Sequence, residues 1–423
     1  MSARADGSGV VVGSADSFFL HVEDTGGPQI AGGIALLHPS PDGGPPLAEI
    51  RDLVHAELPN LPRFDMRLAA GSRWRRPRWV PAPEPDLAWH VIERRSADGL
   101  RGLEAAVAEL AAEPFPRDRP LWRIAMVRDV GPGRSAMVFL MHHALGDGVG
   151  TVTNSLQLMR PRTALPEVDG GPGRLARAAA TGLGIAQLAT DSRPTRWTAQ
   201  GSSRRVFATT RPPLDLVRRA AAARGMRVTD LVLGLVADAV AATCPDLARA
   251  LGGELRVAVP RLVARPGEAV DGKSSRNATG AVMVDVPVDG RPLDELLAEV
   301  RHRARRRLRR PTRAMGSRFV MTTGLRLLPE AGVGWFAGTV YGRRFFQGIL
   351  TNFPGPTGQL SIGGVPIDVV YPVLPLAPGA PIAVGALSWH GVLGTSVAAD
   401  PEVVDPHALL AHFNRTLAAL FAR

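Results

Sequence analysis

Cysteine, lysine and long apolar runs are scarce in this 423-residue sequence. Cys244 is the only cysteine, so neither an intrachain disulfide nor a cysteine-based metal site can form, which fits a reducing cytoplasm. The longest apolar stretch, residues 231–243, is interrupted by Asp238 and is too short to cross a bilayer. The first residues are polar and glycine-rich and carry no secretion signal. We therefore expect a cytoplasmic protein that is soluble or peripheral to the inner face of a membrane.

Arginine supplies nearly all of the positive charge. The formal net charge is +11 and the sequence pI is about 11.2, and Lys273 is the only lysine among the 50 basic residues. GC-rich codons produce such a skew, which weakens a functional interpretation of the charge. The positive field still favours anionic partners such as phosphate-bearing ligands, anionic membranes or nucleic acid. At this length, two domains with large cores are expected.

The most informative stretch is Met141-His142-His143-Ala144-Leu145-Gly146-Asp147-Gly148. It follows a short apolar run, residues 136–140, that predicts a buried strand. A histidine at the end of such a strand, just before a glycine-containing turn, can project into a cleft and act there as a general base near pH 7. Adjacent histidines also occur as metal ligands and as ordinary residues at strand ends.

The spacing His-His-x-x-x-Asp-Gly resembles the signature of the CoA-dependent acyltransferase superfamily, which includes chloramphenicol acetyltransferase and the condensation domains of peptide synthetases. Four further segments, in matching order along the chain, resemble sequence boxes of the bacterial wax ester synthase/diacylglycerol acyltransferase family. They are Ser14-Ala15-Asp16-Ser17-Phe18-Phe19-Leu20 with Glu23-Asp24, Asp118-Arg119-Pro120-Leu121-Trp122, Thr351-Asn352-Phe353-Pro354-Gly355-Pro356 and Tyr371-Pro372-Val373. The resemblance covers nearly the whole chain.

The resemblance implies an α/β fold of two similar chloramphenicol-acetyltransferase-like domains, with mixed sheets flanked by helices. We expect the N-terminal acyltransferase domain with the HHxxxDG motif at residues 1–160, a crossover linker at residues 161–210 and a C-terminal acyltransferase-like domain at residues 211–423. The linker is rich in Arg, Gly, Pro, Ser and Thr and is expected to be partly helical. The active-site channel is expected at the domain interface.

Hydrophobic periodicity and turn residues predict the individual elements. Residues 1–30 are expected to form a loop or a short strand. Helices are predicted at residues 49–58, 100–112, 149–159, 213–224, 228–242, 293–310 and 407–422. Strands are predicted at residues 124–128, 136–142, 255–259, 281–288, 346–352, 367–373, 381–389 and 392–398.

The implied reaction moves a long-chain acyl group from acyl-CoA to a fatty alcohol or diacylglycerol, giving wax ester or triacylglycerol. His143 is then the general base that takes the hydroxyl proton and later protonates the departing CoA sulfur. His142 alternates with His143 along the strand, points to the other face and has a supporting role. Asp147 is implied to be structural, pairing with a distant arginine, while orientation of the imidazole is the alternative. Gly148 permits the tight backbone that follows it and is a candidate for substrate binding.

Three further residues are candidates for substrate binding. Asn352 or Thr351 would place a hydrogen-bond donor near the thioester or the CoA tail, but either could simply end a strand before the Pro354-Gly355-Pro356 turn. Trp122 is expected to shape the fold and the wall of the substrate tunnel.

The chain departs from the family pattern at two places. Thr229-Asp230 stands where the family often has Asn-Asp; Thr229 can still cap a helix, and Asp230 is expected at a helix start or a domain contact. Arg123 follows the Pro-Leu-Trp box, where the family usually has a glutamate or a similar residue. This position is a possible contact of the acceptor.

The implied partners are acyl-CoA, used as a co-substrate, and a lipid acceptor, with neither a metal nor a bound cofactor. Residues 301–313, with eight arginines, are expected to form a solvated helix face or to contact anionic membrane or CoA. Residues 72–79 interleave arginine and tryptophan and predict a loop facing a membrane or lipid droplet. No nucleic-acid motif accompanies them.

Three alternatives remain open from the sequence. The first is an acyltransferase that acts on a specialised-metabolite or sugar hydroxyl, or that uses a carrier-protein thioester, because acceptor pockets diverge within one fold. The second is a non-catalytic relative that binds acyl-CoA or lipid. The third is metal-dependent hydrolysis through the histidine pair, for which the sequence offers no convincing third ligand.

Overall fold

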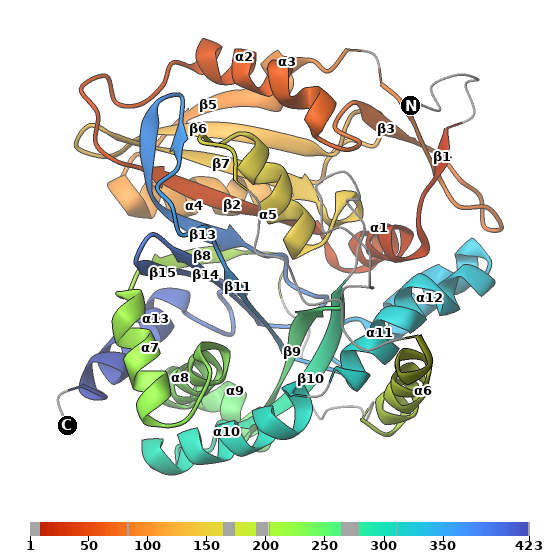
Figure 1. Ribbon diagram of the computed structural model, residues 1–423, viewed down its shortest axis with the longest axis vertical. Helices are drawn as coiled ribbons and strands as arrows, with labels where there is room; N and C mark the ends of the chain where they lie inside the picture. Colours follow the sequence, from red (N-terminus) through yellow and green to blue (C-terminus); the bar gives the residue numbers. More distant parts are fainter. Residues whose placement is uncertain are drawn as a thin grey trace.

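Two six-stranded mixed sheets dominate the structure, each built mainly from one half of the chain (Figure 1). The computed structural model describes residues 9–82, 84–163, 174–191, 202, 204–263, 279–309 and 311–421. Helices flank both sheets, so the predicted α/β class with two sheet-rich halves is confirmed. Among the described residues, no helix combines the length and apolar character needed to cross a membrane.

The first sheet has the strand order β12-β13-β2-β7-β6-β5. Its strands are β2 (Ile30–Leu37), β5 (Val91–Arg95), β6 (Trp122–Gly131), β7 (Arg134–His142), β12 (Ser361–Ile362) and β13 (Val365–Val373). Eight successive residues of β7 are buried, as expected for a strand covered on both faces. The helices that pack on this sheet are α2 (Leu47–Glu57), α3 (Leu87–His90), α4 (Gly99–Ala112) and α5 (Gly148–Gln157).

The second sheet has the strand order β10-β9-β11-β14-β15-β8. Its strands are β8 (Val206–Thr210), β9 (Glu254–Leu262), β10 (Thr279–Pro287), β11 (Gly348–Pro354), β14 (Ile382–Trp389) and β15 (Val392–Ala399). Its helical layer consists of α7 (Leu214–Ala223), α8 (Val228–Thr243), α9 (Pro245–Ala250), α10 (Leu293–Leu308) and α13 (Pro406–Ala419). Helix α8 is apolar on nearly all sides and therefore lies buried among α7, α10 and α13.

Most of the remaining elements lie beside the junction of the two halves, whereas the 3-10 turn after α2 stays with that helix (Figure 1). The remaining elements are β1 (Val10–Val11), β3 (Met66–Ala69), β4 (Arg78–Pro81), α1 (Ser14–Gly26), α6 (Arg174–Asp191), α11 (Thr312–Thr322), α12 (Glu330–Val340) and the 3-10 turns η1 (Leu58–Asn60), η2 (His143–Leu145) and η4 (Gly324–Leu327). Helix α6 crosses α11 so closely that a Cβ at Gly184 would lie 1.9 Å from the Thr312 carbonyl oxygen.

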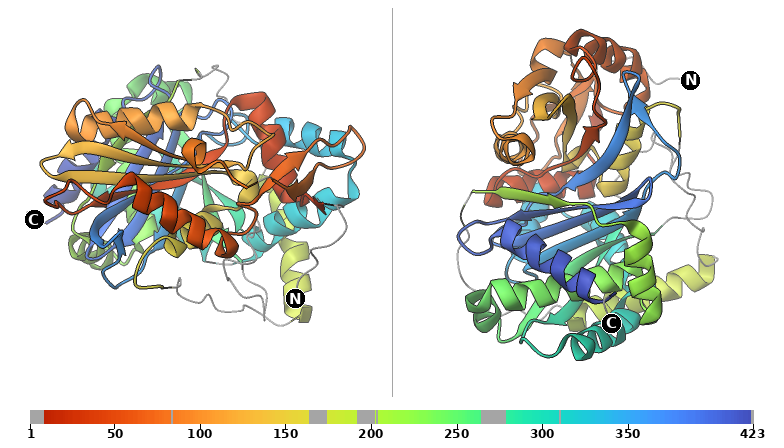
Figure 2. Two further views of the ribbon diagram at one scale, coloured as in Figure 1. Left: turned by 90° about the horizontal axis from the view of Figure 1, so that it is seen from above. Right: turned by 90° about the vertical axis from the view of Figure 1, so that its left-hand side faces the viewer.

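The two halves exchange strands. Strand β13 comes from the second half of the chain, yet it pairs with β2, Tyr371 opposite Ile34, and projects into the N-terminal half (Figure 2). Strand β8, inside the predicted linker 161–210, forms the edge of the second sheet beside β15. Gly394 allows β13 to pass over β15, because a Cβ there would lie 2.1 Å from the Val370 carbonyl oxygen. The first sheet therefore contains strands from both halves of the chain.

All of the predicted helices and strands are present, with ends shifted by a few residues. The predicted helix ends at residues 310 and 422 lie outside the described residues. The prediction for residues 1–30 is confirmed only at the short strand β1; it is wrong for residues 14–26, which form α1, and residues 1–8 lie outside the described residues. Helix α12 was not predicted either. It contains Gly332, Gly334 and Gly338, which lower helix propensity, and it is held by packing on α1, where a Cβ at Gly334 would lie 3.2 Å from the His21 ring.

Candidate active site

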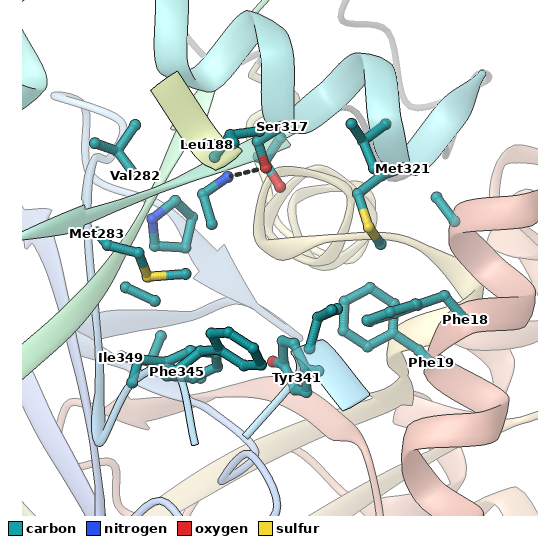
Figure 3. A pocket seen from close by; sticks show the side chains of 18 of the residues that line it. Phe18, Phe19, Leu188, Val282, Met283, Ser317, Met321, Tyr341, Phe345 and Ile349 are labelled. Carbon is teal, nitrogen blue, oxygen red and sulfur yellow. Dashed lines mark hydrogen bonds between the residues drawn. The ribbon is translucent and has the colours of Figure 1, made fainter. Parts of the chain in front are cut away.

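A cavity of about 470 Å³ opens where the two halves meet, and its wall is largely apolar. Figure 3 shows side chains converging on it from α1, from α11 and from the strands of the second sheet. Those labelled include Phe18, Phe19, Met283, Met321, Tyr341 and Ile349. A cavity of this size and lining suits a ligand with a long hydrocarbon chain.

His143 lies on the cavity wall, as the motif predicts. Strand β7 ends one residue earlier, and His143 begins the 3-10 turn η2. Its backbone N–H donates to the Gln29 carbonyl oxygen at 2.8 Å, which fixes the turn to the start of β2. Its ring stacks on Phe19, with centroids 3.7 Å apart and planes 24° apart. The imidazole is thereby held at the cavity edge by a side chain from the first sequence box.

His142 is buried and points away from the cavity, as the alternation predicts. Its Nδ1 accepts a hydrogen bond of 2.9 Å from the Ala144 N–H, so the ring proton resides on Nε2. That nitrogen approaches Glu23 Oε1 at 3.4 Å. Burial raises the pKa of Glu23, but the nearby His142 and Arg117 outweigh it, so the net pKa lies below its ordinary value. His142 therefore fastens η2 to α1.

Asp147 joins the motif to the other half of the molecule. Its Oδ1 accepts from the N–H groups of Val149 and Gly150, both at 3.1 Å, and thereby caps α5. Its Oδ2 accepts from the Thr279 N–H of β10 at 2.9 Å. These contacts fit the structural role that the resemblance implies, and the distant arginine partner stays a prediction.

Gly148 lines the cavity, but for a different reason from the one predicted. Its backbone is not left-handed, so no special turn requires glycine. The limited space favours glycine instead, because a Cβ at Gly148 would lie 3.1 Å from the Phe353 ring.

Strand β11 presents only alternate residues to the cavity. Thr351 and Phe353 line it, whereas Asn352 points to the opposite face, where its amide donates to Thr229 Oγ1 at 3.0 Å. Asn352 is therefore not placed to bind the thioester, and Thr229 is not a helix cap as expected. Asp230 does lie at the helix start, where it accepts from the Arg227 N–H at 3.2 Å.

Trp122 is a core residue and lies outside the cavity wall. It is fully buried, its indole N–H donates to the Phe64 carbonyl at 2.9 Å, and its ring stacks on His90. Burial lowers the pKa of His90 to about 4, so that ring is neutral. Arg123 also lies outside the wall. It covers the Trp89 ring and pairs with Glu113 at 2.9 Å, so it does not contact an acceptor in the cavity.

Several residues of the wall could not be identified from the sequence. Phe19 lies in the first sequence box, where nothing distinguishes it from a core residue, and Tyr341 lies in the unpredicted segment after α12. Burial raises the pKa of Tyr341 well above its usual range, so its hydroxyl is a neutral donor. Arg256 has no distinctive signal in the sequence, because arginines are so frequent in this chain. It pairs with Asp285 at 2.6 Å on the cavity floor.

Comparison with known families agrees with this geometry. Residues 12–166 match the family described as the wax ester synthase/diacylglycerol acyltransferase catalytic domain, and residues 276–421 match the WS/DGAT C-terminal domain. The chain belongs to the wax ester synthase/diacylglycerol acyltransferase family. The predicted class, a CoA-dependent O-acyltransferase, follows from this membership.

Individual relatives extend over most of the chain. A Mycobacterium tuberculosis protein, named as a diacylglycerol O-acyltransferase, is 26% identical over 403 residues, which cover 85% of each chain. Another from the same organism, which bears the name "Probable diacyglycerol O-acyltransferase tgs2", is 34% identical over 143 residues, covering 32% of this chain and 31% of its own.

Solved structures share the fold. The wax ester synthase/diacylglycerol acyltransferase from Marinobacter aquaeolei VT8 superposes with a TM-score of 0.69 at 19% identity, covering 97% of this chain and 98% of its own. The starter condensation domain of rhizomide synthetase, solved with C8-CoA and Leu-SNAC, gives a TM-score of 0.64 at 16% identity, covering 98% of this chain and 95% of its own.

Proposed function

We propose that this protein transfers a long-chain acyl group from acyl-CoA to the hydroxyl of a fatty alcohol or diacylglycerol. The observation that carries this proposal is the position of His143, a candidate general base on the wall of a largely apolar cavity of about 470 Å³. Hydrocarbon chains fill such a space without loss of hydrogen bonds, and the imidazole supplies the base that a hydroxyl acceptor needs.

The proposed reaction is a single displacement through a tetrahedral intermediate. His143 accepts the acceptor's hydroxyl proton as the oxygen attacks the thioester carbonyl. The intermediate collapses by breaking the C–S bond, and the imidazolium returns its proton to the CoA sulfur. Thr351, whose side chain lies in the same cavity, is our candidate donor to the oxyanion. The thioester is already activated, so positioning and proton transfer supply the main acceleration.

The proposed chemistry uses neither a metal nor a bound cofactor, with acyl-CoA as a co-substrate. His142 and His143 face different surroundings, one buried against Glu23 and the other on the cavity wall. They therefore do not form a joint ligand pair, which removes the motivation for metal-dependent hydrolysis.

The proposed partners are acyl-CoA and a membrane-borne lipid acceptor. A related fold, the rhizomide synthetase domain, was solved with C8-CoA, and several relatives are named for diacylglycerol acylation. We place the protein in the cytoplasm, peripheral to a membrane or lipid droplet, where such acceptors reside.

Free-thiol release from palmitoyl-CoA tests the proposal. We expect release that depends on a long-chain alcohol or diacylglycerol and that falls at least about a hundredfold in His143→Ala. Release with water alone would indicate a hydrolase. No release from folded protein with any acceptor would contradict the proposal, and turnover of a carrier-protein thioester alone would identify a different donor.

A further inference from the structure

Two tryptophans lie exposed on one side of the molecule, although large apolar side chains are normally covered. Trp74, at the tip of the β3–β4 hairpin, is 66% exposed, and Trp335, on α12, is 71% exposed. Leu327, in the turn before α12, is 86% exposed. Leu328 and Phe319 nearby are also exposed. We call this set the Trp74–Trp335 surface.

The hairpin and α12 form one continuous surface. The Ala331 N–H in the first turn of α12 donates to the Arg73 carbonyl at 2.9 Å. Arg76 donates to the Leu325 carbonyl at 2.9 Å. The hairpin tip therefore lies beside the start of α12, as both Figure 1 and the left view of Figure 2 show.

The two segments that carry these aromatic residues have charge of almost one sign. Residues 69–81 and 319–346 contain seven arginines and a single carboxylate, Glu330. That carboxylate is buried and engaged with Ser17 and His21, so it does not offset the surface charge. Arg73, Arg75 and Arg326 are exposed beside the tryptophans.

The same helices also line the cavity. Phe336, adjacent to Trp335 on α12, and Met321, two residues beyond Phe319 on α11, both face the cavity interior. Only the thickness of these helices therefore separates the exposed apolar side chains from the cavity.

We propose that the Trp74–Trp335 surface docks on an anionic lipid bilayer and delivers the lipid acceptor to the cavity; the delivery part rests on the proposed function. Tryptophan rings are favoured at the boundary between headgroups and acyl chains, and arginines bind lipid phosphates. Exposed tryptophan and leucine surrounded by arginine match both layers of such a boundary.

The arginine-rich run at residues 301–313 is a poorer candidate. Arg303 is engaged with Glu299 and Glu254, and Arg301 and Arg305 donate to the backbone carbonyls of Arg224 and Gly225. This helix, α10, lies on the far side of the second sheet's helical layer from α12 (Figure 1). Arg301, Arg303 and Arg305 are thus engaged within the protein.

Vesicle co-sedimentation tests the docking without any need for catalysis. Wild-type protein should sediment with phosphatidylcholine–phosphatidylglycerol vesicles and remain in the supernatant with phosphatidylcholine alone. Arg73→Gln/Arg75→Gln should weaken partitioning about tenfold or more, and Trp74→Ser/Trp335→Ser about tenfold. The matched controls, Arg218→Gln/Arg219→Gln on α7 and Leu100→Ser on α4, should bind as wild type does.

Three results would overturn the proposal: no binding of wild type to anionic vesicles, equal loss in the control variants, or no loss in either surface variant. A wild-type dimer that Trp335→Ser converts to a monomer would assign the surface to a second copy of the chain instead. Thiol release with a water-soluble alcohol should be equal in all variants, whereas release with vesicle-borne diacylglycerol should fall in the surface variants. Absence of all thiol release would count against the proposed function and leave the docking result standing.

Discussion

At residue 148 a side chain would crowd the cavity wall. A Cβ there would lie 3.1 Å from the Phe353 ring, closer than a carbon atom normally approaches without displacement of its neighbour. Gly150, two residues later on α5, has open surroundings, with Asp147 Oδ1 at 3.8 Å as its nearest contact. A methyl group would therefore fit at residue 150 but would crowd Phe353 at residue 148.

We expect Gly148→Ala to reduce kcat/KM for thiol release roughly tenfold, because the added methyl forces the Phe353 ring into the cavity. Phe353→Leu in the same chain should restore much of the loss, since the smaller side chain removes the clash. Gly150→Ala is the matched control and should leave the rate unchanged. Strict additivity of Gly148→Ala and Phe353→Leu would argue against this contact.

Asp147 shows how one residue can serve several parts of a site. Its two oxygens bind amides of α5 and of β10, so it positions the motif against the second half of the chain. The sequence predicted a structural role, but the Thr279 amide could not be foreseen because it lies 132 residues away. Conversely, Trp122 belongs to a recognised box, yet it only packs in the core.

At the scale of elements, α12 depends on a buried ionic anchor. Glu330 at its start accepts from the Ser17 hydroxyl and contacts His21 at 2.9 Å, both on α1, and lies 3.7 Å from Arg76. Burial raises the pKa of Glu330, but these hydrogen bonds and charges outweigh it, and the net pKa lies below the ordinary 4.5. The anchor compensates for the weak helix propensity of this glycine-rich helix.

We expect Glu330→Gln to lower the free energy of unfolding by about 1–3 kcal/mol at pH 7. Because the folded-state pKa is depressed, this stabilisation is complete above pH 4.5 and is lost as the pH falls through the folded-state value. The difference between wild type and variant in thermal unfolding should therefore shrink in acid. The exposed Glu295→Gln is the control, and a pH-independent difference would contradict the electrostatic explanation.

Strand register gives the cavity floor a measurable length. Ala258, Met283 and Ile349 form one row across β9, β10 and β11. The Arg256–Asp285 pair forms the next row away from Gly148 and Phe353. From Phe353 back to the level of Arg256 is six residues along β11, or roughly 20 Å, comparable to an extended long acyl chain.

We expect Ala258→Phe to lower kcat/KM for a long-chain thioester or alcohol roughly tenfold or more, while short-chain substrates are affected less. The phenyl ring would stop a long chain at the Ala258 row, before the chain reaches the Arg256–Asp285 pair. Met283→Ala enlarges the same row and should shift the preference the other way. Chain-length profiles measured by thiol release would contradict this view if both variants kept the wild-type optimum.

At the scale of the whole molecule, strand exchange makes the two halves interdependent. Strand β13 covers the edge of β2, where Tyr371 and its neighbours pair along it. Without β13, β2 would become an exposed edge strand whose residues are mostly ones that are buried in the intact protein. Asp147 and Thr279 add a second link between the halves. The cavity exists only when both halves are present, since each contributes part of its wall.

We therefore expect fragments 1–200 and 201–423 to be insoluble or unfolded when expressed separately and to recover soluble protein when co-expressed. Circular dichroism and size-exclusion chromatography of the separate and combined fragments provide the measurement. A stable, monomeric N-terminal fragment with native strand content would show that β13 is dispensable.

The sequence by itself determined the family, the α/β class, most helices and strands, and His143 with its motif, because these depend on local spacing and periodicity. It also separated His142 from His143, since adjacent residues at a strand end face opposite ways. Only the tertiary structure decided that β13 completes the first sheet, that Asn352 faces Thr229, and that α12 forms despite its glycines. Each of these depends on a contact between distant segments, and no local pattern encodes which partner a strand, an amide or a weak helix will meet.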